Sequence, residues 1–293
     1  MKQIGKLGLG TVQWGLRYGL ANQSGMTAPE AVGSILSEAR RVGVRILDTA
    51  AMYGEAEAVL GRNPLDGFRI ITKTPAFALP QIAGRQATEL VEAFRQSLHR
   101  LSTTRIYGLL VHRADDLLVP GGDKLTAALN ALKERGAVEK IGVSVYTADQ
   151  LDEVMKSFKP DIVQLPLSVL DQRMLLNDRL ERMRDARIEI HARSVFLQGL
   201  LLMPMNSVPA YFDPIRPLLQ RWHASAAEQG LTPTQAALGF VRDMDCVDTV
   251  LVGVDDLEQF RSCIADFSTE GSFDASGLAC DDARYLNPSL WKL

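Results

Sequence analysis

The stretch Val44-Arg-Ile-Leu-Asp48-Thr-Ala-Ala-Met-Tyr53-Gly54 decides the fold and points to the chemistry. Val44, Ile46 and Leu47 form a short apolar run that is typical of a buried strand. The small and polar residues that follow do not continue this run, so the strand is expected to end at Asp48. In parallel α/β sheets and barrels, ligands bind at the carboxyl ends of the strands. The stretch therefore predicts a carboxylate, followed closely by a phenol, at a functional edge.

Short apolar runs and amphipathic segments alternate through the rest of the chain. Strands are predicted at 6–11, 44–48, 68–73, 106–111, 141–143, 161–165, 188–192 and 249–252. Helices are predicted at 28–42, with Thr27 as its cap and Gly43 as its stop, and at 55–60, 88–101, 124–135, 148–158, 179–186, 218–229, 233–242 and 256–265. This alternation, with no linker-like composition between the halves, predicts an α/β fold of the (β/α)8 TIM-barrel type. We expect one barrel domain over residues 1–293.

Composition narrows the classes of partner. Hydrophobic residues make up 46% and charged residues 23% of the 293 residues, which is ordinary for a globular protein. The formal net charge of -3, without a basic run, argues against nucleic acid and membrane surfaces. No segment resembles a signal peptide or a membrane helix, and Cys246, Cys263 and Cys280 lack the spacing of zinc ligands. We therefore expect a cytoplasmic protein that acts on small molecules and binds no metal.

Polar side chains end most of the predicted strands. Because the carboxyl ends of barrel strands meet at one mouth, these side chains are expected to share one pocket. For a single residue, the approach to solvent would explain the polarity equally well, but six in succession favour a site. They are Asp48, Lys73, His112, Ser144, Gln164 and Arg193.

Three of these groups, together with Tyr53, suit the reduction of a carbonyl. Tyr53 has an ordinary pKa of about 10, and an adjacent Lys73 ammonium is expected to lower that pKa. Asp48 would keep Lys73 charged, and His112 would hydrogen-bond the reacting oxygen. Such a set can deliver a proton to a carbonyl oxygen while a hydride reaches the carbon. Protein side chains supply no hydride, so a nicotinamide cofactor is implied.

The motifs around these residues resemble those of the aldo-keto reductase superfamily, in family order across nearly the whole chain. They are Leu47-Asp48-Thr49-Ala50 with Tyr53-Gly54, Ile71-Thr72-Lys73, Leu110-Val111-His112, Ile141-Gly142-Val143-Ser144, Val163-Gln164 and Gln198-Gly199-Leu200. The resemblance implies a catalytic set of Asp48, Tyr53, Lys73 and His112, with Tyr53 as the general acid for reduction. It also implies an extended NAD(P) over the barrel mouth, with Ser144 and Gln164 at the nicotinamide carboxamide. The expected cofactor contacts are Gly10, Thr11, Ser144, Gln164, Arg193, Ser194, Leu197, Gly253, Val254, Asp255 and Gln259.

The chain departs from the family pattern at three places. Val145 follows Ser144 where an asparagine is common, which removes one amide contact. Arg193 stands where a tyrosine commonly stacks on the nicotinamide, and its charge would disfavour the oxidised, cationic ring. Asp255 and Asp256 occupy the region where relatives place a basic residue against the 2'-phosphate of NADPH. We therefore expect NADH rather than NADPH, unless Arg261 or another loop compensates for the two carboxylates.

Other signals carry less weight. Gly8-Leu9-Gly10 begins a dinucleotide fingerprint but does not complete it, which excludes a Rossmann interpretation. His99 and His223 are expected on helices and His191 inside a strand, none of them in a site. No cluster of His, Asp and Glu has metal-ligand spacing.

The substrate is expected to be an aldehyde or ketone, with sugars among the candidates. Trp14 and Arg113, in loops after strands, are expected to contact it. Two other functions stay open: a lyase that uses Lys73 as a Schiff-base nucleophile, and a non-catalytic subunit that senses the nucleotide. The oligomeric state has no signature in the sequence.

Overall fold

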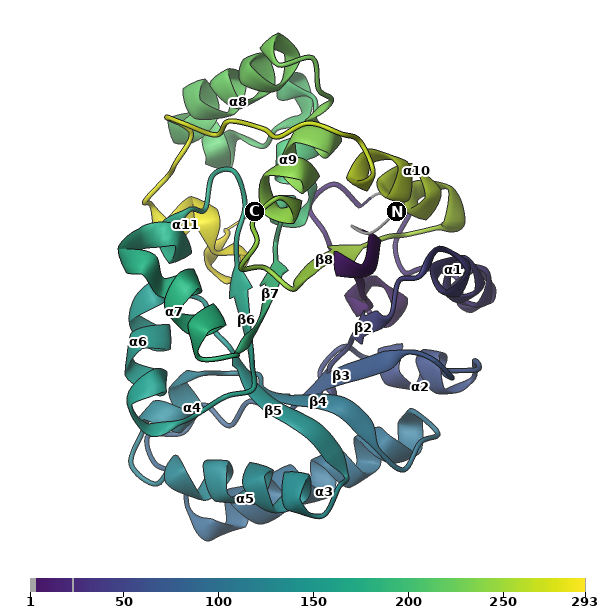
Figure 1. Cartoon of the computed structure of the whole chain (residues 1–293), viewed down its shortest axis with the longest axis vertical. Helices are drawn as coiled ribbons and strands as arrows, with labels where there is room; N and C mark the ends of the chain where they lie inside the picture. The colour runs from purple at the N-terminus through teal and green to yellow at the C-terminus, as the bar shows by residue number, and fades with distance from the viewer. Residues whose placement is uncertain (1–3, 23, 293) are drawn as a thin grey trace.

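Eight parallel strands close into a barrel in the computed structural model, which describes residues 4–22 and 24–292 (Figure 1). The strands are β1 (Leu7–Gly10), β2 (Ile46–Asp48), β3 (Arg69–Lys73), β4 (Ile106–Val111), β5 (Val138–Ser144), β6 (Ile162–Pro166), β7 (Glu189–Arg193) and β8 (Thr249–Gly253). Each strand pairs with the next in the chain, and β8 pairs with β1, which closes the ring. The predicted (β/α)8 barrel is therefore confirmed.

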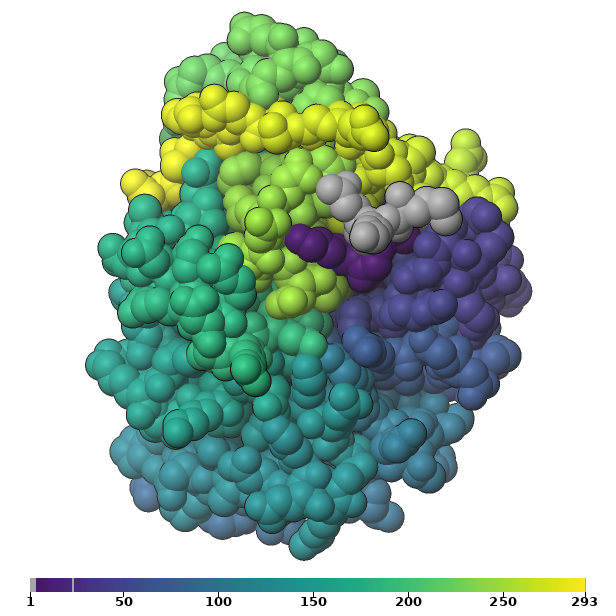
Figure 2. All heavy atoms as spheres, viewed as in Figure 1, coloured from purple at the N-terminus to yellow at the C-terminus, as the bar shows by residue number. Residues whose placement is uncertain are grey.

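The helices lie outside the ring, as Figure 1 shows. They are α1 (Pro29–Val42), α2 (Ala56–Gly61), α3 (Gly84–Arg100), α4 (Asp115–Leu118), α5 (Asp123–Glu134), α6 (Ala148–Ser157), α7 (Arg179–Asp185), α8 (Arg216–Glu228), α9 (Pro233–Arg242), α10 (Leu257–Phe267) and α11 (Ala283–Leu286). Helices α1 to α9 connect consecutive strands, and α10 and α11 follow β8. The residues beyond α10, yellow in Figure 2, cross the surface beside α8 before they reach α11.

Some boundaries differ from those predicted, for local reasons. Thr27 does not cap α1: Ala28 holds the cap position without a side-chain bond, and the Thr27 hydroxyl lies 3.5 Å from the Val254 carbonyl oxygen instead. Helix α3 begins at Gly84, before the expected position, because the Gln86 side chain accepts a hydrogen bond from Ala83 N. Strand β5 begins at Val138 because Ile106 and Val138 pair across the sheet.

The register brings the strand ends to one level. Gly10 lies opposite both Asp48 and Gly253, Ser144 lies opposite Gln164, and Arg193 pairs with Pro166. Below this level the barrel interior is filled by Ile46, Ile71, Tyr107, Leu110, Ile162 and Leu251. A packed interior leaves ligands only the open end of the ring, which is where the polar strand ends meet.

The structure also places the remaining histidines and the cysteines. His191 is buried in β7, as expected, and His99 is exposed on α3. His223 lies on α8, a helix as expected, and is half-buried. All three cysteines are buried and unpaired. Within residues 4–22 and 24–292, no helix is both long and apolar enough to cross a membrane.

Candidate active site

Asp48, Lys73 and Tyr53 come together at the open end of the barrel. Asp48 ends β2, Lys73 ends the neighbouring β3, and Tyr53 lies in the turn after β2. Lys73 Nζ lies 2.6 Å from Asp48 Oδ2, and it donates hydrogen bonds to the carbonyl oxygen of Thr49 at 2.9 Å and to the Tyr53 hydroxyl at 3.4 Å. The phenol, the ammonium and the carboxylate therefore form one contiguous cluster.

A glycine contact fixes the turn that carries Tyr53. A Cβ on Gly15 would collide with the carbonyl oxygen of Tyr53, and a Cβ on Gly54 would collide with that of Gly15. Gly54 also has a φ of 54°, in the region that favours glycine. This close approach lets the segment after β1 support the turn after β2, and with it the Tyr53 side chain.

His112 completes the cluster from the end of β4. Its ring packs edge-on against the Tyr53 ring, with 5.8 Å between the centroids. Burial lowers the pKa of His112 to about 3, and the positive charges of Lys73 and Arg193 act in the same direction. The imidazole is therefore neutral at ordinary pH, and it can donate one hydrogen bond to a bound oxygen without carrying charge.

The pKa values of Tyr53 and Lys73 show how burial and charge compete here. Burial raises the pKa of Tyr53, and the nearby Lys73 ammonium offsets only part of that rise. The Lys73 ammonium lowers the Tyr53 pKa as expected, but desolvation of the phenolate outweighs it and the net pKa lies above the ordinary value. Burial lowers the pKa of Lys73, but Asp48 more than compensates, so the net pKa lies above the ordinary value. At neutral pH the phenol keeps its proton and the lysine keeps its charge.

Gln164 binds the carboxylate from the far side of the barrel. Its Nε2 donates a 2.7 Å hydrogen bond to Asp48 Oδ1, and its side chain is buried. The amide nitrogen of Gln164 is thus committed to Asp48, which leaves the Gln164 oxygen for a ligand. Ser144 lies beside it on β5.

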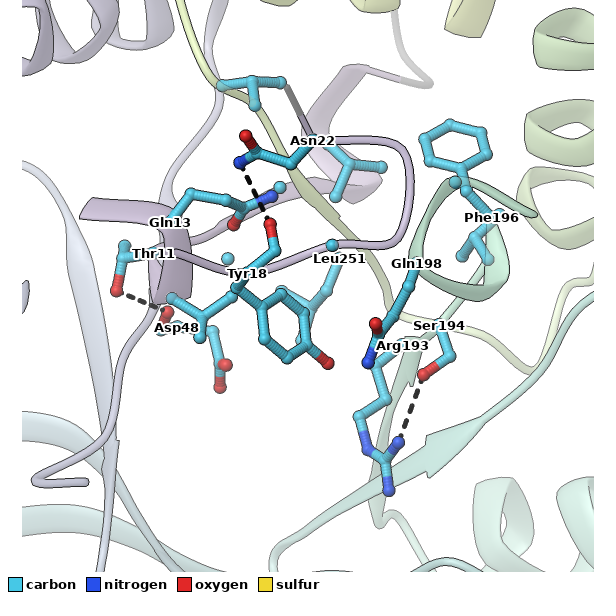
Figure 3. Close-up of a pocket in the computed structure, with 18 of the residues that line it drawn as sticks. Thr11, Gln13, Tyr18, Asn22, Asp48, Arg193, Ser194, Phe196, Gln198 and Leu251 are labelled. Carbon is cyan, nitrogen blue, oxygen red and sulfur yellow. Dashed lines mark hydrogen bonds between the residues drawn. The ribbon is translucent and has the colours of Figure 1, made fainter. Parts of the chain in front are cut away.

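These residues open into a cavity of about 430 Å³ (Figure 3). It runs from Tyr53 and His112 to Ser262 and Asp266 on α10. Its lining includes the expected site residues Gly10, Thr11, Asp48, Tyr53, His112, Ser144, Gln164, Arg193, Ser194, Gly253, Val254, Asp255 and Gln259. Lys73 lies beneath Asp48 and Tyr53, buried from the cavity.

Three expected contacts do not line the cavity. Trp14 is buried in the core, because the short helix Val12–Trp14 turns its side chain inward. Leu197 is also buried, since its segment packs against the barrel. Arg113 is exposed and lies 3.4 Å from Asp115 and 3.9 Å from Asp116. For Trp14 and Arg113, the predicted substrate contact finds no support in these positions.

The cavity also contains residues that the sequence analysis did not assign to the site. Gln13, Asn22, Tyr146 and Gln198 all line it. Asn22 belongs to a loop after β1 that is held against the β7 loop, where Ala21 N donates to the carbonyl oxygen of Gln198 at 3.3 Å. Figure 3 shows this loop above the cavity, with Tyr18 and Gln198 facing the same space. The sequence held a usable signal for Tyr146, placed just after strand β5, and for Gln198, which lies in the Gln198-Gly199-Leu200 motif.

The far end of the cavity carries carboxylates. Asp255 follows β8 and accepts a 3.2 Å hydrogen bond from Asn22 Nδ2, while Gln259 Oε1 accepts one from Asp255 N. Arg261 does not reach this end, because it lies 3.8 Å from Glu38 instead. Among the cavity-lining residues that the structure describes, Arg193 is the one lysine or arginine.

The Schiff-base alternative loses support at this point. A Schiff-base nucleophile must be uncharged and must reach the substrate, whereas Lys73 is fully buried, paired with Asp48 and held charged. Within the described part of the chain, no group of three or more His, Cys, Asp or Glu residues could hold a metal ion.

Comparison with known proteins identifies the family of this chain. The model of the aldo/keto reductase family matches residues 6–275. The NADH-specific methylglyoxal reductase of Escherichia coli (strain K12) is 26% identical over 89% of this chain and 89% of its own. The D-arabinose 1-dehydrogenase of Saccharomyces cerevisiae is 23% identical over 93% of this chain and 88% of its own. The holo form of an aldo-keto reductase from Bacillus halodurans has the same fold, with a TM-score of 0.71 at 20% identity over 90% and 87% of the two chains. This chain therefore belongs to the aldo/keto reductase family, whose members are oxidoreductases that reduce carbonyl groups.

Proposed function

We propose that this protein reduces a small aldehyde or ketone to an alcohol, with Tyr53 as the proton donor and NADH as the source of hydride. The observation that carries the proposal is the 3.4 Å contact between the Tyr53 hydroxyl and a lysine that is itself paired with Asp48. A phenol in this setting keeps its proton until a carbonyl oxygen accepts it, and the adjacent ammonium then stabilises the phenolate that is left.

Each member of the cluster has a separate part in this step. Tyr53 gives its proton to the carbonyl oxygen, and Lys73 stabilises the resulting negative charge. Asp48 and Gln164 fix Lys73 and keep it charged. His112, neutral because its pKa is about 3, orients the carbonyl oxygen. When bound, a reduced nicotinamide supplies the hydride that the carbonyl carbon receives.

The cavity fits such a dinucleotide. It is long, and it reaches from the phenol to α10. Gln13 lines it, and its Oε1, which is buried and has no hydrogen-bond partner among the described residues, is an acceptor left for a ligand. Ser144, Gln164 and Arg193 would hold the nicotinamide end. Gly10, Thr11, Ser194, Gly253, Val254, Asp255 and Gln259 would hold the remainder, and Leu197 would act through its backbone alone.

The preference for NADH follows from charge. Asp255 lies at the end of the cavity far from Tyr53, and Arg261 turns away from it to Glu38. A 2'-phosphate there would meet a carboxylate and no cation, whereas the 2'-hydroxyl of NADH can donate to that carboxylate. The printed name of the Escherichia coli relative, an NADH-specific methylglyoxal reductase, agrees with this preference.

The substrate is a small carbonyl compound. Exposed apolar side chains lie near Tyr53: Leu16 lies beside Gly54, Tyr18 lines the cavity and Met52 precedes Tyr53 in the chain. They favour a compact molecule with an apolar part. The names of the two relatives, a methylglyoxal reductase and a D-arabinose 1-dehydrogenase, give a short dicarbonyl and a pentose as the first compounds to assay.

The test combines binding with turnover. The intact protein is titrated with NADH and NADPH while tryptophan fluorescence is followed, and a panel of aldehydes and ketones is then assayed with the preferred cofactor. Tyr53→Phe should bind NADH with nearly unchanged affinity and should lose carbonyl reduction. If the variant retains wild-type turnover, Tyr53 is not the proton donor. Tight dinucleotide binding without turnover of any carbonyl would instead favour the nucleotide-sensing subunit.

A further inference from the structure

Arg193, at the end of β7, is held in one position by three neighbours. Its Nη2 donates a 2.9 Å hydrogen bond to the carbonyl oxygen of Val145, and its Nη1 donates one of 3.2 Å to Ser194 Oγ. Its guanidinium carbon lies 4.2 Å from the centre of the Tyr146 ring, a cation–π contact. Arg193 lines the cavity, and Figure 3 shows the hydrogen bond between its guanidinium and Ser194. The planar group is thus fixed on one face and open to the cavity elsewhere.

The charge of Arg193 is uncompensated at the catalytic end of the cavity. Lys73 and Asp48 cancel each other as a pair at 2.6 Å, and Tyr53 and His112 are neutral at ordinary pH. Among the residues that the structure describes, Arg193 forms no ion pair, and the other cavity carboxylates belong to the β8 loop and α10. This end of the cavity therefore carries one net positive charge.

We infer that Arg193, positioned by Tyr146, makes this cavity bind the reduced, neutral nicotinamide cofactor more tightly than the oxidised, cationic one. The inference rests on the proposed function. Hydride and proton add to the two atoms of one carbonyl bond, so the nicotinamide must lie at the end of the cavity that holds Tyr53 and Arg193. Only oxidation places a positive charge on that ring, and like charges at short range repel more strongly in a protein cavity than in bulk water. Arg193 thus selects the redox state of the cofactor, and Tyr146 is a positioning residue that acts through it.

The measured quantity is the ratio of the dissociation constants for NAD+ and NADH, obtained by calorimetry or fluorescence on the intact protein. The diphosphate and the adenosine are common to both ligands, so any contact of Arg193 with them largely cancels in the ratio. We expect a wild-type ratio well above one, and a drop of about tenfold in Arg193→Gln. If Arg193→Gln does not fold, Arg193→Met, which keeps the aliphatic stem, is tested in its place.

Tyr146 offers a matched pair of variants. Tyr146→Phe keeps the ring under the guanidinium and should keep the wild-type ratio, whereas Tyr146→Leu removes the ring and should lower the ratio part of the way towards that of Arg193→Gln. Arg95→Gln, which removes an exposed charge on α3, controls for the total charge of the protein and should leave the ratio unchanged.

The outcomes separate this inference from the proposed function. If wild-type protein binds neither NADH nor NAD+, the proposed function fails and the inference fails with it. If both bind and Arg193→Gln keeps the wild-type ratio, the inference is wrong while the proposed function stands. If Tyr146→Phe lowers the ratio as far as Tyr146→Leu does, the tyrosine does not act through its ring face, and its positioning role is refuted.

Discussion

Gln164 and Lys73 bind the two oxygens of a single buried carboxylate. Gln164 Nε2 donates to Asp48 Oδ1 at 2.7 Å, and Lys73 Nζ lies 2.6 Å from Oδ2. Strands β3 and β6 are thereby joined through the end of β2. The carboxylate thus has a charged partner on one side and a neutral donor on the other, which is what a buried charge requires.

Replacing Gln164 should therefore destabilise the fold and not only alter ligand binding. Gln164→Leu leaves Oδ1 of Asp48 without a donor, and we expect the free energy of unfolding to fall by about 1–3 kcal/mol. Urea denaturation measures this change. Ser144→Ala, at the paired position on β5, is the matched control and should lower the free energy of unfolding by less. A Gln164→Leu protein as stable as wild type would show that water replaces the amide.

Removing Lys73 should destabilise the fold more than removing Gln164 does, because it leaves the buried Asp48 carboxylate without its positively charged partner. Lys73→Met leaves the Asp48 carboxylate buried beside a neutral side chain, and we expect a loss of about 3–5 kcal/mol in the free energy of unfolding. The double variant Lys73→Met with Asp48→Asn removes both charges and should recover much of that loss. A double-mutant cycle by denaturation gives the coupling energy. If the double variant is as unstable as the sum of the two single variants, the pair is not coupled in the folded protein.

The pKa of His112 predicts a pH dependence of stability. Burial lowers that pKa from 6.5 to about 3, so between these values the unfolded chain takes up a proton that the folded chain excludes. This contribution to stability is complete above pH 6.5 and is lost as the pH falls. Unfolding free energies measured from pH 7.5 to 4.5 should therefore fall more steeply in wild type than in His112→Gln.

The same shift predicts the pH profile of the reaction. Because His112 stays neutral, kcat for carbonyl reduction should show no ionisation near pH 6.5. His99→Gln, a change on the exposed side of α3, is the matched control for removing a histidine. A kinetic pKa near 6.5 that disappears in His112→Gln would contradict a neutral role for this imidazole.

The sequence predicted the architecture because the relevant information is local and repeated. Each strand is an apolar run that stops at a polar residue, as in Leu47-Asp48, and the helices carry their own stop signals, as at Gly43, whose φ is 93°. Eight such units leave few ways to bury both faces of a parallel sheet. The polar strand ends then meet because a closed ring brings all carboxyl ends to one side.

The positions of loop side chains could not be predicted from the sequence in the same way. Trp14 was expected at the pocket, but a short helical turn directs it into the core. Tyr146 reaches Arg193 only because β5, β6 and β7 adjoin in the ring. The direction of the Tyr53 pKa depends on the balance between burial and the Lys73 charge, and residue types alone do not give that balance.

Asp255 should determine the choice between the two reduced cofactors. Its carboxylate lines the cavity and accepts a hydrogen bond from Asn22, and Arg261 lies against Glu38 rather than nearby. We expect Asp255→Ser to raise the affinity for NADPH relative to NADH by about tenfold, because it removes repulsion of the 2'-phosphate. Fluorescence titration with both cofactors gives the ratio. Asp256→Asn is the matched control: it removes the neighbouring charge outside the cavity and keeps a side chain able to cap α10, where Asp256 accepts from Gln259 N. If Asp256→Asn shifts the ratio as much as Asp255→Ser, general charge and not the Asp255 contact sets the preference.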